Sequence, residues 1–481
     1  MRGRNRAEHA VKQWSTSSKE RQMMQNDRRV KHLLGRPIVK LKTMIARRIQ
    51  DEKLNGMLEA GKFERQRRTR VCVGRLLDEK GTAAVTESGR QEIVGRFYDK
   101  LFAIGDSAGR MPRWIFKSWG EDIFLGWPEL DGALMGRMIC KLAANKSCGE
   151  DTIVAEMLKA LDWDGKTLLA EIIKLRIRNH ESEWFDDAWM VRMVALIPKV
   201  PRACTITKFR PITVSAVLLK LVSMVLLEFT ASLIDVAIGE TQFAFRPGYQ
   251  AHEVVYCLRH MIEKKVEYHW PPMVLVAGDI YKFYDSIKHP ALIQRLTKAG
   301  LPRFAVASWV RETRHSRACF VLPGSAPTRG VVRERSLIQG EPAAPGLSAV
   351  HLQGPLDRFR RICRGQGWGI SLGVVEGELE EKNWLDILNF ADNFWIVAKN
   401  TLEAARMTEC WLDLLENDGL EVPLRDMEWG WTAQDVQQAS LTIRGTCIKK
   451  VKRNEGMQVL GTQITLDNCA TVEVANRLRS A

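Results

Sequence analysis

The spacing of apolar residues predicts helices in the first half of the chain. Ile93, Phe97 and Leu101 recur every four residues, which is typical of one face of a helix. Residues 214–238 show the same helical spacing, but three charged residues interrupt them. The longest apolar stretch is therefore predicted to be a buried amphipathic helix rather than a membrane span.

Continuous apolar runs, most of them in the second half of the chain, predict strands. Residues 193–197 read as a short strand, and residues 273–277 form an apolar run that leads directly into Gly278 and Asp279. Residues 384–398 read as a hairpin whose polar tip is residues 391–393. Two Gly/Pro-rich or polar segments, 324–346 and 365–381, are predicted to be loops. Strands with helices between and after them indicate an α+β fold.

Two carboxylates stand where packing gives no reason for them. Asp279 ends one apolar strand, and Asp392 sits at the tip of the hairpin. Taken singly, each is a common strand-end turn residue. If the two strands lie side by side, the carboxylates form an anionic cleft suited to Mg²⁺. Two such ions about 3.5–4 Å apart can hold the attacking and leaving oxygens of a phosphoryl transfer.

Charge is unevenly distributed along the chain. The net charge is +15, and residues 1–70 hold 20 Lys/Arg against 7 Asp/Glu. A basic head before a nearly neutral body predicts a polyanionic partner held mainly by the head. A solvated arm is the alternative. The denser arginine cluster within residues 65–70 fits a nuclear signal, a phosphate patch or a solvated helix face.

The ten cysteines are single, without CxxC or Cys/His spacing, which argues against a zinc site or a disulfide framework. Scattered thiols favour a reducing compartment. We therefore expect the protein in the nucleus or cytoplasm, without a membrane partner.

Seven segments, in order along the chain, resemble the reverse transcriptases of LINE-type (non-LTR) retrotransposons. Those upstream are Ile197-Pro-Lys199 with Phe209-Arg-Pro-Ile212, similar to "IPK…RPI", and Gln242-Phe-Ala-Phe-Arg-Pro-Gly248, similar to "QxGFRPG". The central ones are Asp279-Ile-Tyr-Lys-Phe-Tyr-Asp-Ser-Ile287, similar to "DxxKAFDxI", Gln339-Gly-Glu-Pro-Ala-Ala-Pro345, similar to "QGxPLSP", and Phe390-Ala-Asp-Asn393, similar to "YADD". The last are Gly419-Leu-Glu-Val-Pro423 with Arg425, similar to "GLxxNxxK", and Leu460-Gly-Thr462, similar to the primer grip.

The resemblance implies a fold and a set of domains. It predicts a right-hand polymerase with fingers and an antiparallel palm sheet backed by helices. The expected parts are a basic arm, partly disordered or helical, at 1–89, a helical connector at 90–190, fingers at 191–272, a palm with fingers insertions at 273–466, and the truncated start of a thumb at 467–481.

The resemblance also assigns roles. Asp279 and Asp392, with Asn393 beside them, are the implied catalytic residues. The implied metal ligands are Asp279, Asp392 and the backbone carbonyl of Ile280. The expected cofactor is a pair of Mg²⁺ ions, for which Mn²⁺ substitutes, and the expected partners are an RNA template, a DNA primer and dNTPs.

Five further residues are implied to bind the nucleotide. Lys199 and Arg210 meet the triphosphate, where a guanidinium suits phosphate oxygens; plain surface charge is the alternative. Tyr284 matches the steric gate against a ribose 2′-OH, with core packing as the alternative. Gln339 and Gly340 match the floor of the pocket, where glycine permits close approach.

Several departures from the family pattern bear on activity. Asn393 stands where the family box has a second aspartate, Ala343 and Ala344 replace the Leu-Ser of the "QGxPLSP" box, and Glu341 adds an acid to it. The chain also ends about twenty residues after the primer-grip segment. RNA-directed DNA synthesis is therefore the leading function, and a catalytically inactive fragment that only binds nucleic acid is the alternative. An intron-maturase relative is a third reading, against which the absence of a basic C-terminal extension argues.

Overall fold

The computed structural model describes nine stretches of the chain. They are residues 73–103, 110–149, 151–178, 189–200, 202–314, 316–323, 325–372, 384–433 and 439–480. The basic head, its arginine cluster and residues 373–383 of the second expected loop lie outside them. The chain divides into two compact units, one with Ser118–Trp189 and Ala216–Val222, the other with Arg70–Lys117, Met190–Ser215 and Ser223–Ala481.

The smaller unit is helical in its described part. Its helices are α4 (Gly132–Lys141), α5 (Ala155–Lys159) and α6 (Trp163–Arg178), preceded by the 3₁₀ turn η3 (Glu121–Phe124). Asp131 sets the start of α4 because its carboxylate accepts a hydrogen bond from the Leu134 N–H at 2.8 Å. The buried residues of α4, among them Leu134 and Met138, lie against α6.

A five-stranded sheet forms the centre of the larger unit. Its strands, in spatial order, are β10 (Ile387–Phe390), β11 (Asn393–Ala398), β5 (Val274–Asp279), β12 (Glu428–Trp431) and β15 (Lys449–Lys450). All neighbours are antiparallel except β12 and β15. The central strand β5 is buried on both faces, which explains its continuous apolar sequence.

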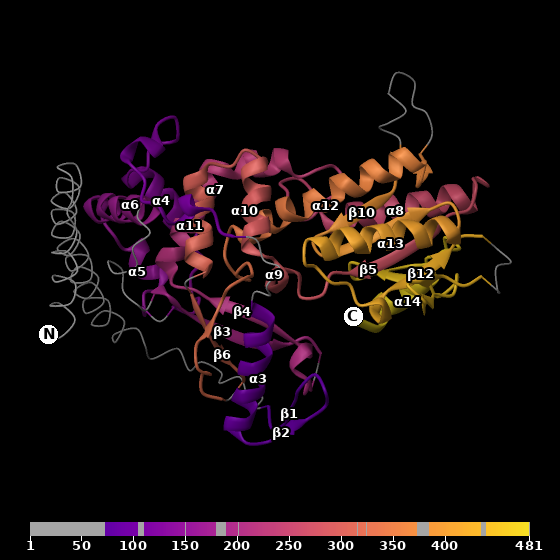
Figure 1. Cartoon of the computed structure of the whole chain (residues 1–481), viewed down its shortest axis with the longest axis horizontal. Helices are drawn as coiled ribbons and strands as arrows, with labels where there is room; N and C mark the ends of the chain where they lie inside the picture. Colours follow the sequence, from indigo (N-terminus) through magenta and orange to yellow (C-terminus); the bar gives the residue numbers. More distant parts are fainter. Residues whose placement is uncertain are drawn as a thin grey trace. The chain divides into compact units, whose positions relative to one another are not determined.

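Each face of this sheet has its own cover. On one face, α8 (Ala251–Val266) and the hairpin of β16 (Met457–Val459) and β17 (Thr462–Ile464) enclose a core that includes Leu258, Leu275 and Trp395. On the other, α13 (Thr401–Asn417) packs against β5 and β11, and α12 (Ala344–Gln366) packs against α13. Figure 1 shows α13 lying along this sheet.

A second, four-stranded sheet belongs to the same unit. Its order is β4 (Phe209–Val214), β3 (Val191–Pro198), β6 (Arg317–Val321) and β7 (Val331–Val332). Helix α3 (Glu87–Phe102) covers one face, as Figure 1 shows. Tyr98 of α3 stacks on Phe320 of β6 with ring centroids 3.9 Å apart. The α3–sheet contact is therefore an apolar, aromatic core.

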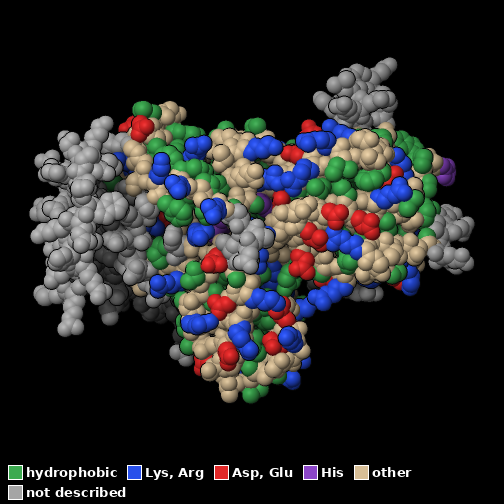
Figure 2. Space-filling view, viewed as in Figure 1, with side chains coloured by type: hydrophobic (Ala, Val, Ile, Leu, Met, Phe, Trp, Pro, Cys, Tyr) green, Lys and Arg blue, Asp and Glu red, His purple; other side chains and the backbone are tan. Residues whose placement is uncertain are grey.

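Further elements complete the described part of the chain. The helices are α7 (Val217–Ala237), α9 (Phe283–Ser286), α10 (His289–Lys298), α11 (Arg303–Arg314) and α14 (Thr471–Ser480), with 3₁₀ turns η2 (Arg113–Phe116), η6 (Ile206–Lys208) and η8 (Leu424–Asp426). The remaining strands are β1 (Leu76–Leu77), β2 (Ala83–Ala84), β8 (Ile370–Ser371), β9 (Trp384–Leu385), β13 (Thr442–Ile443) and β14 (Thr446–Cys447). Lys/Arg and Asp/Glu side chains are intermixed over the visible described surface (Figure 2).

Helix α7 is the expected amphipathic helix. By length and composition it is the one helix in the described ranges that could cross a membrane, and 61% of its most apolar window is buried within the protein. The nine cysteines that fall within those ranges are free thiols, as their single spacing predicts.

Three details differ from the sequence expectations. Residues 76–84 form a β-hairpin and α3 begins at Glu87, so regular structure starts inside the segment expected to be a disordered or helical arm. The loop expected to reach residue 346 ends earlier, because α12 begins at Ala344 with Pro345 in its first turn, where a proline costs no hydrogen bond. The apolar run 384–390 is interrupted at Asp386, and its first part, β9, pairs with β8 in another sheet.

Candidate active site

The apolar strand β5 ends at Asp279. Val274, Leu275 and Val276 are fully buried, whereas Asp279 reaches solvent at the end of the strand. The burial of the first three residues fixes the strand between its neighbours. The carboxylate is consequently held at a defined point on the edge of the core.

The neighbouring strand brings the second carboxylate to the same place. Asn393, the first residue of β11, lies directly opposite Asp279. The Ile280 N–H donates a hydrogen bond to the Asp392 carbonyl oxygen at 3.0 Å. The structure therefore places Asp279 and Asp392 side by side, although 112 residues separate them in the sequence.

The two carboxyl groups perturb each other. Loss of hydration, followed by repulsion from Asp392, raises the pKa of Asp279 to about 7. Loss of hydration also raises the pKa of Asp392. Two carboxyl groups this close together share one proton more readily than they carry two negative charges. A cation bound between them would therefore be strongly favoured.

Gln242 holds the tip of the hairpin in position. Ala391 has a left-handed backbone, with φ 58°. The fully buried Gln242 donates to the Ala391 carbonyl at 3.3 Å and accepts from the Ala391 N–H at 3.0 Å. Its oxygen also accepts from the Ala244 N–H at 3.1 Å. One amide side chain thus fixes the backbone immediately before Asp392.

Two cations, one on β4 and one just after β3, act electrostatically on this carboxylate pair. Arg210 on β4 pairs in register with Ile197 of β3, and Lys199 follows Ile197 by two residues. Both cations are exposed. Lys199 lowers the pKa of Asp279, and Lys199 and Arg210 both lower that of Asp392. The site therefore combines acidic groups on one sheet with exposed cations from another.

A comparison with known families identifies this arrangement. A family model described as "Reverse transcriptase (RNA-dependent DNA polymerase)" matches residues 197–461, more than half of the chain. The chain belongs to this family. Its fold is therefore that of polymerase fingers and palm, in agreement with the α+β expectation, and reverse transcriptases bind a nucleic-acid template, a primer and dNTPs.

Among the residues expected to shape the nucleotide pocket of the reverse transcriptase, Tyr284 lies near the pair, whereas Gln339 and Gly340 lie beside Thr213 of β4. Tyr284 is half-buried; burial, opposed by a hydrogen bond with Ser348, raises its pKa to about 12, and the Asp392 charge contributes. The Gln339 carbonyl accepts from the Thr213 N–H at 3.0 Å. Gly340 has φ 105°, and a Cβ there would lie 2.7 Å from the Thr213 carbonyl oxygen. Only glycine suits this turn beside β4.

The side-chain oxygens of this site determine whether it suits a metal ion. Reverse transcriptases generally use divalent metal ions. In the described ranges no group of three or more His, Cys, Asp or Glu side chains is placed to hold one. The two carboxylates are hard oxygen donors that fit Mg²⁺, which takes one or two carboxylates and keeps water or phosphate oxygens as its other ligands. Ile280 is buried and its N–H is bound to Asp392, while the role of its carbonyl oxygen stays a prediction.

Asn393 and Glu341 are two of the residues at which the sequence departs from the family pattern. The Asn393 amide donates to Asp392 Oδ1 at 3.4 Å, so it lies beside the acidic pair but adds no charge. Glu341 contributes its charge near Arg333, whose pKa burial lowers to about 10.

The sequence-based choice of site residues omitted a buried charged group within the Asp279–Ile287 segment. Asp285 is buried, and loss of hydration raises its pKa to about 6, opposed by Lys282 and Arg333. Lys282 has a left-handed backbone, with φ 47°, and its ammonium lies 5.4 Å from the Phe97 ring centre. The sequence contains a hint of this group, since Lys282 and Asp285 flank two aromatic residues. Nothing in the local sequence showed which of these side chains point inward.

Proposed function

We propose that this reverse transcriptase copies RNA into DNA for a LINE-type retroelement, with Asp279 and Asp392 as ligands of two catalytic Mg²⁺ ions. The observation that carries the proposal is the register of β5 and β11, which sets the two aspartates next to each other. The order of the seven sequence segments supports the LINE-type assignment.

The remaining residues have complementary tasks. Lys199 and Arg210 bind the triphosphate of the incoming nucleotide, because both are exposed and both act on the Asp392 carboxylate. Gln339 and Gly340 form the floor beneath the nucleotide, and Tyr284 meets its sugar. When bound, the metal ions neutralise the phosphate and activate the primer 3′-hydroxyl.

A second candidate is a polymerase fold that binds nucleic acid without synthesis. Asn393 favours it, since the site then carries two carboxylates where the family's two acidic boxes together supply three. Both candidates predict binding of a primed template. Only the first predicts extension of the primer.

Primer extension by the purified full chain tests the proposal. We expect DNA synthesis on a primed RNA template with Mg²⁺ or Mn²⁺, and a loss of at least ~10²-fold in Asp279→Asn, as expected when one charge that stabilises the transition state is removed. Asp413→Asn is the matched control, because Asp413 is an exposed acid on α13 that pairs with Arg444. It should extend primers at the unmodified rate.

Two results would count against polymerisation through this pair. Equal extension by Asp279→Asn and the unmodified chain would remove Asp279 from the metal site. Tight binding of primed template without extension under either metal would establish the second candidate.

A further inference from the structure

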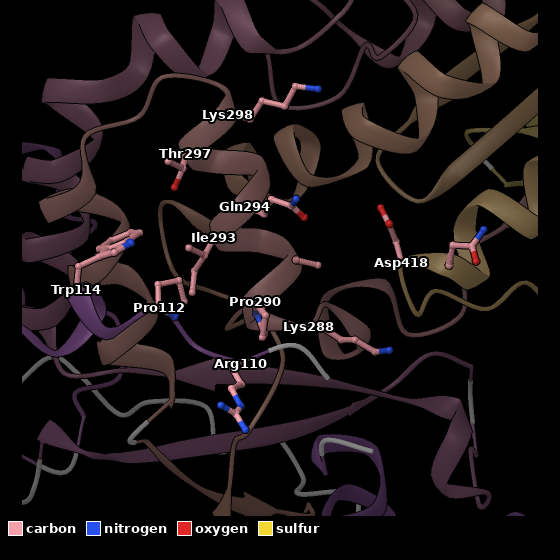
Figure 3. A pocket seen from close by; sticks show the side chains of 12 residues that line it. Arg110, Pro112, Trp114, Lys288, Pro290, Ile293, Gln294, Thr297, Lys298 and Asp418 are labelled. Atoms are coloured by element: carbon pink, nitrogen blue, oxygen red, sulfur yellow. The ribbon is translucent and has the colours of Figure 1, made fainter. Parts of the chain in front are cut away.

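A cavity of about 730 Å³ lies along α10, outside the group of residues assigned to nucleotide transfer. Figure 3 shows Gln294 and Lys298 on α10 and Lys288 at its N-cap, with Trp114 and Pro112 to one side and Asp418 to the other. Every lining residue belongs to the larger unit.

The charges that line the cavity are unbalanced. Arg110, Lys288 and Lys298 have no ion-pair partner within the stretches that the structure describes. The single acid, Asp418, is already paired with Arg295 at 3.1 Å and with Arg358 at 3.2 Å. Three cations are therefore left to act on whatever enters the cavity, and they favour an anion.

The rest of the lining favours the same kind of ligand. Helix α10 begins in the cavity, and its N-cap residue, Lys288, makes no capping hydrogen bond through its side chain. Pro290 in the first turn has no N–H, so the N–H groups of His289 and Ala291, together with the helix dipole, favour a negative group there. The Thr297 hydroxyl is buried and has no hydrogen-bond partner in the described part of the chain. Trp114 is half-buried, with the Arg303 guanidinium 5.6 Å from its ring centre, and adds a flat ring of the type on which bases or sugars stack.

The separation of the cations indicates a ligand with more than one anionic group. Lys288 and Lys298 lie ten residues apart along α10, about 15 Å along the helix axis. One phosphate cannot contact positions that far apart, whereas successive phosphates of a strand can.

We propose that this cavity binds the sugar–phosphate backbone of a nucleic-acid strand, as a site additional to the nucleotide pocket. Phosphates contact Lys288, Lys298 and Arg110, and Trp114 packs against a base or sugar. The contact concerns the backbone and so does not select a sequence.

Salt-dependent binding tests this site without any need for catalysis. The full chain is titrated with a single-stranded RNA in the absence of dNTPs, at a series of salt concentrations. Replacing Arg110, Lys288 and Lys298 by glutamine should reduce the slope of log K against log salt by about 2, since each lost phosphate contact on a single strand removes ~0.7. The matched control replaces Arg361, Arg364 and Arg406, exposed arginines of α12 and α13, by glutamine. It removes the same charge and should leave the slope unchanged.

A single position provides a second, independent reading. Gln294 is exposed in the cavity, so Gln294→Lys should tighten RNA binding and Gln294→Glu should weaken it, with no change in unfolding temperature. Equal slopes for the cavity and control triple variants, or equal affinities of the two Gln294 variants, would overturn the proposal. Saturable binding of inorganic phosphate that the cavity variant loses, with the RNA slope intact, would identify a small-anion site instead and also overturn it. Because binding is measured without synthesis, a failure here is distinct from a failure of primer extension.

Discussion

Opposite Asp279, the central sheet carries an amide where its family box has a carboxylate. Asn393 lies beside Asp392 and donates to it, so this position adds neither a charge nor a bridging carboxylate oxygen to the acidic pair. Two carboxylates offset −2 against the +4 of two Mg²⁺ ions. Glu341 is not among the main charges that shift the pKa of Asp279 or Asp392. A second metal ion should therefore bind weakly.

Restoring the carboxylate should increase synthesis. We expect Asn393→Asp to raise the rate of primer extension at least ~10-fold, equivalent to about 1.4 kcal/mol of activation free energy. The unmodified chain should prefer Mn²⁺, and the variant should shift the preference toward Mg²⁺. The measurement is single-turnover extension across both metals. Robust Mg²⁺-dependent synthesis by the unmodified chain, without gain in the variant, would show that the amide is no defect.

Tyr284 gives a separate residue-scale prediction. Its ring lies near Asp392 and the Ser348 hydroxyl, where the sugar of an incoming nucleotide is proposed to lie. Tyr284→Ala should raise ribonucleotide incorporation relative to deoxyribonucleotide by ~10-fold or more, since shape alone discriminates a single hydroxyl by up to ~10². Tyr284→Phe, which keeps the ring, should retain the original ratio. An unaltered ratio in an active Tyr284→Ala variant would assign the ring to packing.

At the scale of elements, the strands and helices that carry strong periodicity were predictable. The run 273–277 became β5, the helical spacing of residues 214–238 became α7, and residues 387–398 became the hairpin of β10 and β11. In each case the local pattern of apolar residues predicts burial. A strand enclosed on both faces is apolar throughout, and a helix with one buried face has apolar residues at helical spacing.

Long-range partners were not predictable from local pattern. Asp386 interrupts an apolar run because its carboxylate, buried in the core, lies 3.7 Å from Arg360 of α12. Nothing near Asp386 in the sequence reveals that arginine. Asp285 has one opposing charge nearby in the sequence, Lys282, but the next one, Arg333, comes 48 residues later. The adjacency of Asp279 and Asp392 was inferred from the family resemblance rather than from spacing.

The tip of the β10–β11 hairpin is held by Gln242, a side chain from outside the hairpin, and this contact can be tested. Gln242→Met would leave the Ala391 and Ala244 N–H groups buried without an acceptor, which should reduce the free energy of unfolding by about 2–4 kcal/mol. Because the tip also positions Asp392, extension should fall by ~10–10²-fold even at temperatures where the variant is fully folded.

The control for the hairpin test is Gln366→Met, at the exposed C-terminal end of α12. It should change neither quantity. A folded Gln242→Met variant with normal extension would show that Gln242 stabilises the fold without positioning the site.

For the whole molecule, a buried histidine couples stability to pH. His289 is fully buried, and burial lowers its pKa to about 4; the hydrogen bond from its Nε2–H to the Ser336 carbonyl at 2.9 Å favours the charged ring and opposes part of that shift. Its positively charged neighbours, Arg314 and Arg333, lower it further. The unfolded chain takes up the proton near pH 6.5, so the contribution to stability is complete above that pH and is lost as pH falls toward 4.

Urea unfolding at two pH values measures this effect. Between pH 8 and pH 5, His289 alone should account for about 2 kcal/mol of lost unfolding free energy. His289→Gln cannot titrate, so its loss over the same interval should be smaller by that amount. His260→Gln, at an exposed position on α8, is the control and should match the unmodified chain. Identical pH dependence in all three proteins would refute the assignment.

The position of β5 has a consequence during synthesis on the ribosome. This strand lies between β11 and β12, and both partners are encoded more than a hundred residues after it. At translation rates of ~5–20 residues per second, its backbone N–H and C=O groups stay unpaired for ~5–25 s before either neighbour exists. During that interval the nascent chain presents an unpaired, uncharged strand, a form prone to intermolecular pairing. The carboxylate pair thus arises late, and the yield of active protein should depend on chaperones that shield β5 until β11 emerges.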